Sequence, residues 1–97
     1  MKIWMSIKII SYDLHRPEQN YSELIKAINN YDCCKINKSD WLVRTYVSCK
    51  IVRDDLKKYI DYNDTLFVAE LSEKSGWWAS YDLDKKAVNW LNNLQAV

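Results

Sequence analysis

The spacing of apolar and polar residues predicts a β-strand at the start of the chain. Between residues 3 and 14 the two kinds of side chain alternate with a period of two, which is typical of a half-buried strand. The alternation changes phase at Ile9 and Ile10, where two apolar residues are adjacent. The end of this strand is therefore expected to be buried on both faces or to carry a bulge.

A helical spacing recurs three times further along the chain. Apolar residues at i, i+3, i+4 and i+7 predict a helix over residues 21–30, and a second apolar stripe predicts one over about 49–60. Asn20 and Ser48 precede these segments and have side chains suited to N-caps. A third helix is expected in the tail, capped by Asp82 or Asp84. Its apolar face would consist of Ala87, Trp90, Leu91 and Leu94.

Further strands are predicted between and after the first two helices. Residues 33–36 and 41–47 flank a turn, and residues 65–71 form a near-continuous apolar run, as in a strand covered on both sides. Residues 77–81 are a possible fifth strand. The order β-α-β-β-α-β predicts an α+β, ferredoxin-like fold, in which two helices cover one face of a four-stranded antiparallel sheet.

Composition narrows the class of protein. The 97 residues predict one domain, with a core over 1–72 and an extension over 73–97. A single glycine, Gly76, excludes a P-loop and a dinucleotide-binding fingerprint, and the net charge of +1 gives no overall attraction to nucleic acid. No secretory signal or membrane span is predicted, and three cysteines without a signal favour buried thiols in the cytoplasm over disulfides or a zinc site.

Several chemically active residues follow the predicted strands. Asp13, His15 and Arg16 lie at the end of the first strand, and Ser48, Cys49 and Lys50 lie at the end of the third. We expect the ends of these two strands to lie at the same edge of the sheet. That edge would then gather a carboxylate, an imidazole, cations and the N-terminus of the second helix, which favours anions.

Four segments in this order resemble a known family. They are Ile10-Ser11-Tyr12-Asp13-Leu14, Asn20-Tyr21-Ser22-Glu23-Leu24, Ser39-Asp40-Trp41-Leu42-Val43 and Asp64-Thr65-Leu66-Phe67-Val68-Ala69-Glu70-Leu71. Over residues 7–94 the chain is similar to the SinR-like small ferredoxin-fold proteins. These are related to the second CRISPR-associated protein family, the partner in spacer acquisition, and more distantly to virulence-associated protein D.

The resemblance implies a homodimer with a metal site. Asp13 matches the aspartate that such proteins place at the two-fold axis, where the pair is proposed to hold Mg²⁺ or Mn²⁺ for phosphodiester cleavage, here of RNA more than DNA. Other members bind nucleic acid or a larger protein partner without catalysis. This chain departs from the family pattern because it has no basic groove and no long basic loop after the third strand.

Each candidate residue also has a structural interpretation. Asp13 could accept hydrogen bonds in a turn, and His15 could be a general acid or base or simply a solvated loop residue. Trp77, Trp78 and Tyr81 could stack bases, cover the sheet or form an interface. The candidate phosphate contacts are Arg16, Lys35, Lys38, Arg44 and Lys50.

Two functional hypotheses remain open. One is a metal-dependent endonuclease with paired Asp13 carboxylates. The other is a non-catalytic dimeric module that binds nucleic acid or protein, such as a scaffold or an inhibitor encoded by a phage or plasmid. The matching Asp13 favours the first, and the absence of a second acidic ligand at a fixed spacing favours the other.

Overall fold

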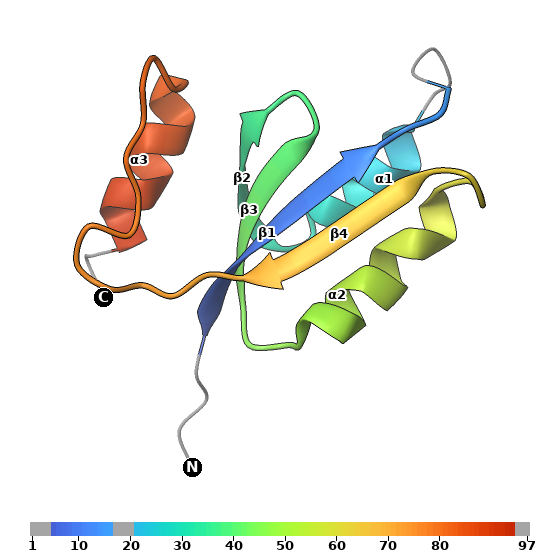
Figure 1. The fold of residues 1–97 in the computed structure, drawn as a ribbon, viewed down its shortest axis with the longest axis horizontal. Helices are drawn as coiled ribbons and strands as arrows, with labels where there is room; N and C mark the ends of the chain where they lie inside the picture. Colours follow the sequence, from blue (N-terminus) through green and yellow to red (C-terminus); the bar gives the residue numbers. More distant parts are fainter. Residues whose placement is uncertain (1–4, 17–20, 95–97) are drawn as a thin grey trace.

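The order of the first six helices and strands is the one predicted. In the computed structural model, which describes residues 5–16 and 21–94, four strands and two helices alternate as β-α-β-β-α-β and a third helix follows (Figure 1). The elements are β1 (Ser6–Asp13), α1 (Ser22–Ile28), β2 (Asp32–Asn37), β3 (Asp40–Thr45), α2 (Cys49–Leu56), the 3₁₀ turn η1 (Lys57–Tyr59), β4 (Thr65–Glu70) and α3 (Lys85–Asn93).

The sheet has the strand order β2-β3-β1-β4, and every neighbouring pair is antiparallel. Across β1 and β3, Ser6 lies opposite Thr45 and Ser11 lies opposite Asp40. Across β1 and β4, Asp13 lies opposite Thr65. This arrangement is compatible with the ferredoxin-like fold, so the predicted fold class is confirmed.

Helices α1 and α2 cover one face of the sheet, which we call the helix face (Figure 1). The residues of β1 that point to this face are the even-numbered ones, including Ile10 and Tyr12. Inside this core the indole N–H of Trp41 donates to the Tyr12 hydroxyl at 3.1 Å, which satisfies a buried donor. Its buried residues are Ile10, Tyr12, Leu24, Ala27, Ile28, Trp41, Val43, Val52 and Leu56.

The opposite face, which we call the tail face, carries a second core. Here α3 and the segment before it pack on odd-numbered residues of β1 and on β2 and β3. Burial on both faces accounts for the adjacent Ile9 and Ile10, because the register of β1 runs through them without a shift. The buried residues of this second core are Ile7, Cys34, Leu42, Ala87 and Leu91.

The predicted fifth strand is wrong. Residues 77–80 pair with no strand among the described residues. Gly76, with φ of 72°, turns the chain at that point, and glycine adopts a positive φ more readily than other residues. Trp77 and Trp78 are then both partly buried against the second core, so these neighbours do not point to opposite sides as in a strand.

Helix starts follow the predicted chemistry in two of three cases. The Ser48 hydroxyl accepts from the backbone N–H of Ile51, and the Asp84 carboxylate accepts from that of Lys86. Asp84 is therefore the cap of the last helix, whereas Asp82 lies before it with a positive φ of 57°. Helix α1 begins one residue later than expected and has Tyr21 at the N-cap position, and the proposed cap Asn20 lies outside the described residues.

One part of the tail face is open. Helix α3 lies over β2, away from β4 (Figure 1), and Phe67 of β4 is 62% exposed. The prediction that this strand is covered on both sides is therefore wrong: β4 is a sheet edge and its odd-numbered residues have no covering layer among the described residues. We call the side chains of Ser11, Asp13, Thr65 and Phe67 on this side the open face.

Candidate functional site

The structure separates the residues that we expected at one edge. Because β1 and β3 are antiparallel neighbours, the end of β1 lies beside the start of β3, and the end of β3 lies beside the start of β1. Asp13, His15 and Arg16 are therefore at the opposite end of the sheet from Ser48, Cys49 and Lys50. The predicted cluster of a carboxylate, an imidazole and a helix N-terminus is wrong.

Asp64 organises the loops at the Asp13 end. Its carboxylate accepts from the backbone N–H of His15 at 2.6 Å, from the backbone N–H of Asp61 at 2.8 Å and from the Tyr21 hydroxyl at 3.1 Å. Desolvation of the carboxylate would raise its pKa, but the hydrogen bonds together outweigh desolvation and hold the pKa of Asp64 below its ordinary value. Asp64 thus fixes the end of β1 against the loop before β4.

Asp13 lies on the open face with an exposed carboxylate. No hydrogen bond or ion pair to this carboxylate is found within residues 5–16 and 21–94, whereas its backbone carbonyl accepts from the Thr65 hydroxyl at 3.5 Å. The described part of one chain also has no group of three His, Cys, Asp or Glu residues that could hold a metal. Among the described residues Asp13 is the one carboxylate of the open face, so a metal site built from them would need ligands from a second copy.

The five predicted phosphate contacts do not form one surface. Arg16 and Lys38 are at the Asp13 end, in the loop after β1 and in the β2–β3 turn. Lys35 is over the Trp41 ring, 5.7 Å from its centroid, which is a cation–π distance. Arg44 and Lys50 are toward the other end of the sheet, because Arg44 lies opposite Ile7 and Lys50 is in the first turn of α2.

A buried lysine near the start of β1 was not predicted. Lys8 is 2% exposed, and its ammonium donates to the Ser6 hydroxyl and to the Thr45 carbonyl at 3.2 Å. It also pairs with Glu70 at 3.3 Å, while Ser6 donates to the same Glu70 oxygen at 2.9 Å. The hydrogen bonds from Ser6 and Lys8 and the charge of Lys8 lower the pKa of Glu70. This cluster is a satisfied ion pair.

Two of the three cysteines, Cys33 and Cys34, are not activated for nucleophilic chemistry. Cys33, Cys34 and Cys49 are all free, but only Cys34 is a buried thiol, as expected; Cys33 and Cys49 are partly exposed. Burial first, and then the neighbouring Cys33, raise the pKa of Cys34 to about 11. Burial and Asp32 also raise the pKa of Cys33, so both groups are thiols at neutral pH.

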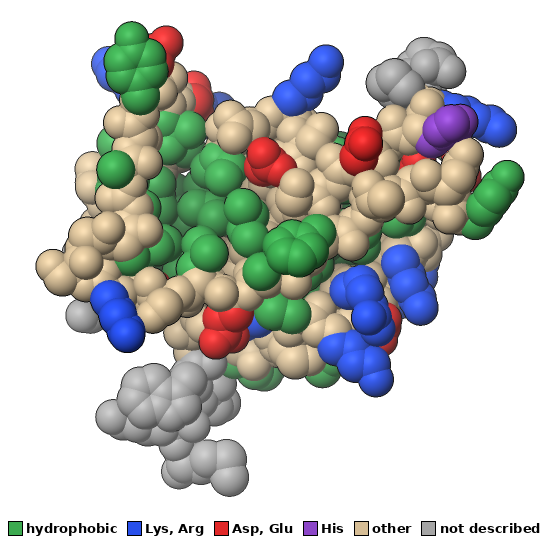
Figure 2. All heavy atoms as spheres, in the orientation of Figure 1, with side chains coloured by type: hydrophobic (Ala, Val, Ile, Leu, Met, Phe, Trp, Pro, Cys, Tyr) green, Lys and Arg blue, Asp and Glu red, His purple; other side chains and the backbone are tan. Residues whose placement is uncertain are grey.

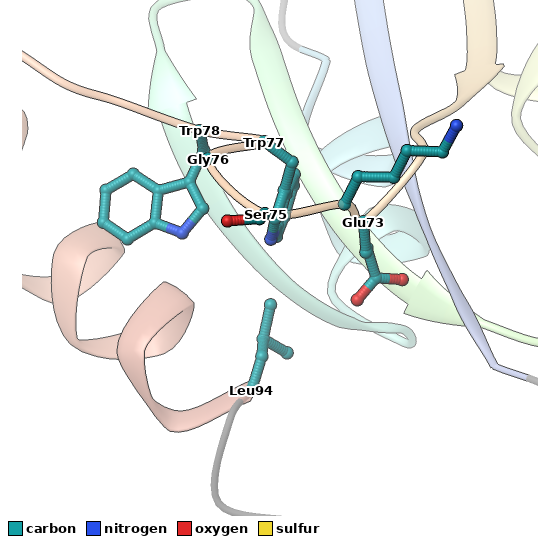
Figure 3. A pocket seen from close by; sticks show the side chains of 7 residues that line it. Glu73, Ser75, Gly76, Trp77, Trp78 and Leu94 are labelled. Carbon is teal, nitrogen blue, oxygen red and sulfur yellow. The ribbon is translucent and has the colours of Figure 1, made fainter.

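The predicted interface aromatics have two different environments. Trp77 and Trp78 pack partly on the second core. They line a hollow of about 550 Å³, which lies between the segment around Gly76 and Leu94 at the end of α3 (Figure 3). Tyr81 is 98% exposed. The tryptophans therefore contribute first to intramolecular packing, and only Tyr81 is fully available to a partner.

Comparisons with known proteins add no assignment. Neither the protein-family models nor the curated proteins contain a match to this chain. Within residues 5–16 and 21–94, none of the helices has the length and apolar character needed to cross a membrane.

Proposed function

We propose that the chain acts as a homodimeric, non-catalytic binding module that self-associates through the open face. The observation that carries this proposal is Phe67, an aromatic ring 62% exposed in the middle of a regular strand. Ser11 lies directly opposite Phe67, and Asp13 lies opposite Thr65. A second copy stacked on this face would remove an apolar side chain from water without changing either core.

Charge placement supports protein over nucleic acid as the ligand of this module. A groove for nucleic acid gathers Lys and Arg along one track. Here Lys35 faces the Trp41 ring, and Arg44 and Lys50 are distant from the Asp13 end. Arg16 and Lys38 are the two at the Asp13 end, in the loop after β1 and in the β2–β3 turn. We therefore infer a protein ligand, consistent with the non-catalytic members that the SinR-like resemblance includes.

Sedimentation velocity of Phe67→Asp tests the dimer. We expect the wild type at micromolar concentration to sediment as a dimer and Phe67→Asp as a species near 11.6 kDa, because the new charge would be buried in the interface. Tyr62→Asp is the matched control, since Tyr62 is fully exposed in the loop before β4. A wild type that is monomeric, or a dimer that tolerates Phe67→Asp, would contradict the proposal.

A metal-dependent phosphodiesterase is the second candidate function. It is favoured by the exposed Asp13 carboxylate, which shares the open face with Phe67 and would approach its mate across a two-fold axis. Two facing carboxylates supply the oxygen ligands that Mg²⁺ or Mn²⁺ prefers, and the metal would polarise the phosphoryl group and activate a water. His15, whose backbone is fixed by Asp64, would be the nearby acid or base.

An assay of single-stranded RNA cleavage, with the wild type and the Asp13→Asn variant side by side, separates the two candidate functions. If the pair is catalytic, activity requires Mg²⁺ or Mn²⁺ and is lost in this variant, which keeps the shape of the side chain but removes its charge. His15→Gln would then lower activity without removing it. If the module is non-catalytic, neither the wild type nor the variants cleave RNA or DNA. The same purification route must be used for all proteins, so that a contaminating nuclease is recognised.

We also propose that the protein acts in the cytoplasm. Support comes from its three free cysteines, two of which have thiols with a raised pKa. Such thiols persist where the environment is reducing.

A further inference from the structure

The outer edge of β4 has a row of unpaired backbone groups. Leu71 donates its N–H to the Ile7 carbonyl at 2.8 Å, so these two residues form a hydrogen-bonded pair of the antiparallel ladder. Along an antiparallel ladder, hydrogen-bonded pairs alternate with pairs that are not hydrogen-bonded to each other. Ala69, Phe67 and Thr65 consequently direct their N–H and C=O groups to β1. Those of the three residues between them, Leu66, Val68 and Glu70, point to the free edge.

The two edges of the sheet are protected differently. Strand β2 is contacted by α3 and is irregular between Lys35 and Asn37. Bulges and covering helices are the usual protection against strand addition. Strand β4 keeps a regular register along its whole length and contains no proline or lysine. Among the described residues, none hydrogen-bonds to its outer side. The β4 edge is therefore open to an additional strand.

A row of basic side chains follows this edge on the helix face. Val52 and Leu56 of α2 face the sheet, whereas Ile51, Asp55 and Lys58 line a hollow with Tyr31 on the side toward α1. Three other residues, at spacings i, i+3 and i+7, occupy the opposite flank of α2. This flank is turned away from α1 and toward the outer edge of β4, the strand that α2 contacts. We call them the basic row: Lys50, Arg53 and Lys57. Figure 2 shows Lys and Arg atoms gathered over α2.

The basic row keeps a positive excess despite one acidic neighbour. Arg53 binds Asp54 at 2.8 Å and Lys57 lies 3.7 Å from the same carboxylate. A single Asp54 thus partners two cations, and Lys50 has no ion pair among the described residues. Glu70, at the end of the edge, is already paired with Lys8. Acidic side chains entering on this side would meet the remaining positive charge.

We infer that the β4 edge receives an extended segment of another protein as a fifth strand, with acidic side chains toward the basic row and apolar ones beside Phe67. A peptide backbone supplies both the donors and the acceptors that Leu66, Val68 and Glu70 need. Nucleic acid is disfavoured because its phosphates have no donors for the outward carbonyl groups. The alternation of acidic and apolar residues follows from the period of two in a strand. The backbone edge itself, formed by Leu66, Val68 and Glu70, is not part of the open face proposed for the dimer, although it adjoins that face at Phe67.

Amide hydrogen exchange measured on the full chain tests the inference. The probe is a capped peptide of the length of β4 that alternates valine with glutamate. We expect it to bind and to protect the amides of Leu66, Val68 and Glu70, while those of Phe67 and Ala69 are slow already in the free protein. A peptide with lysine in place of glutamate should not bind, and proline in place of valine should abolish binding.

Charge variants of α2 give a second readout. The double variant Lys50→Glu/Lys57→Glu should bind the valine–glutamate peptide about fivefold more weakly, the effect of two exposed charges. Lys26→Glu/Lys58→Glu changes the net charge equally but lies away from β4, and its affinity should equal that of the wild type. All four sites are exposed, so folding should persist in both.

Four results would overturn the inference. The first is a valine–glutamate peptide that does not bind at millimolar concentration. The second is a lysine peptide that binds as tightly as the glutamate peptide. Oligoadenylate could protect the three outward amides in place of the peptide, which would identify the edge as a nucleic-acid surface. In the absence of peptide, these amides could become better protected as the protein concentration rises. That result would show that a second copy of the chain occupies the edge. None of these readouts depends on whether Phe67→Asp changes sedimentation.

Discussion

The ion pair of Lys8 and Glu70 makes an asymmetric prediction about stability. The lysine is 2% exposed, whereas the Glu70 side chain is 59% exposed. Replacing Glu70 by Gln removes the negative charge beside the buried ammonium and leaves it only neutral acceptors, namely the Ser6 hydroxyl, the Thr45 carbonyl and the new amide oxygen. Replacing Lys8 by Met instead removes the buried charge and leaves a carboxylate that water can solvate. Glu70→Gln should therefore destabilise the protein more than Lys8→Met.

The magnitude follows from the exposure of the two partners. Breaking a fully buried pair costs about 3–5 kcal/mol, and exposed pairs contribute about 0–1 kcal/mol. With one partner buried and the other solvated, leaving the buried Lys8 ammonium without its counter-charge should cost an amount between these limits, about 2 kcal/mol. For a domain of this size that loss lowers Tm by about 10 °C. Lys8→Met should change stability by less than about 1 kcal/mol, since methionine fills a similar volume.

Urea unfolding of the two single variants and of the double variant measures this difference. In the double variant Lys8→Met/Glu70→Gln no charge remains to be compensated, so its stability should match Lys8→Met within about 0.5 kcal/mol. If Lys8→Met is the more damaging change, the pair is a net source of stability and the reasoning from desolvation is refuted. Equal, small effects would show that Lys8 gains solvent when Glu70 is lost.

Two more predictions concern the second core and the loop carboxylate. Leu91→Ala should cost about 2–5 kcal/mol in urea titration, because Leu91 is 2% exposed beneath α3 and truncation leaves a cavity; a cost below about 1 kcal/mol would mean that α3 is weakly attached. The pKa of Asp64 in the folded protein is lower than its ordinary value of 3.8. The contribution of Asp64 to the free energy of unfolding is therefore fully present above pH 3.8 and is lost as the pH falls through the folded pKa. Acid unfolding should accordingly depend less on pH in Asp64→Asn, and an unchanged pH profile would contradict the hydrogen-bond assignment.

Local signals in the sequence predicted most of the fold because they coincide with the tertiary contacts. The Ser48 cap and the stripe containing Val52 and Leu56 define α2 by themselves. The pair Ile9 and Ile10 indicated a strand buried on both faces, which became correct once α3 and the tail covered the second face. Each of these features needs only its own neighbours along the chain.

The errors arose where apolar composition does not reveal what lies above a residue. The run from Leu66 to Ala69 has the composition of a strand covered on both sides, yet the tail stops over β2 and leaves Phe67 exposed. The sequence around Trp77 and Trp78 is compatible with a strand, but the turn at Gly76 directs both side chains onto the second core. Burial there depends on the path of the tail, which no local period encodes.

The candidate site shows how strand direction decides chemistry. Asp13 ends β1 and Cys49 comes shortly after β3, but antiparallel pairing places those strand ends at opposite ends of the sheet. In a parallel sheet the same residues would meet. What Asp13 does meet is Thr65 and the loop held by Asp64, neither of which could be chosen from spacing in the sequence. Among the described residues, the Asp13 carboxylate could hold a metal only with ligands from a second copy, so the proposed metal-dependent activity requires the proposed dimer.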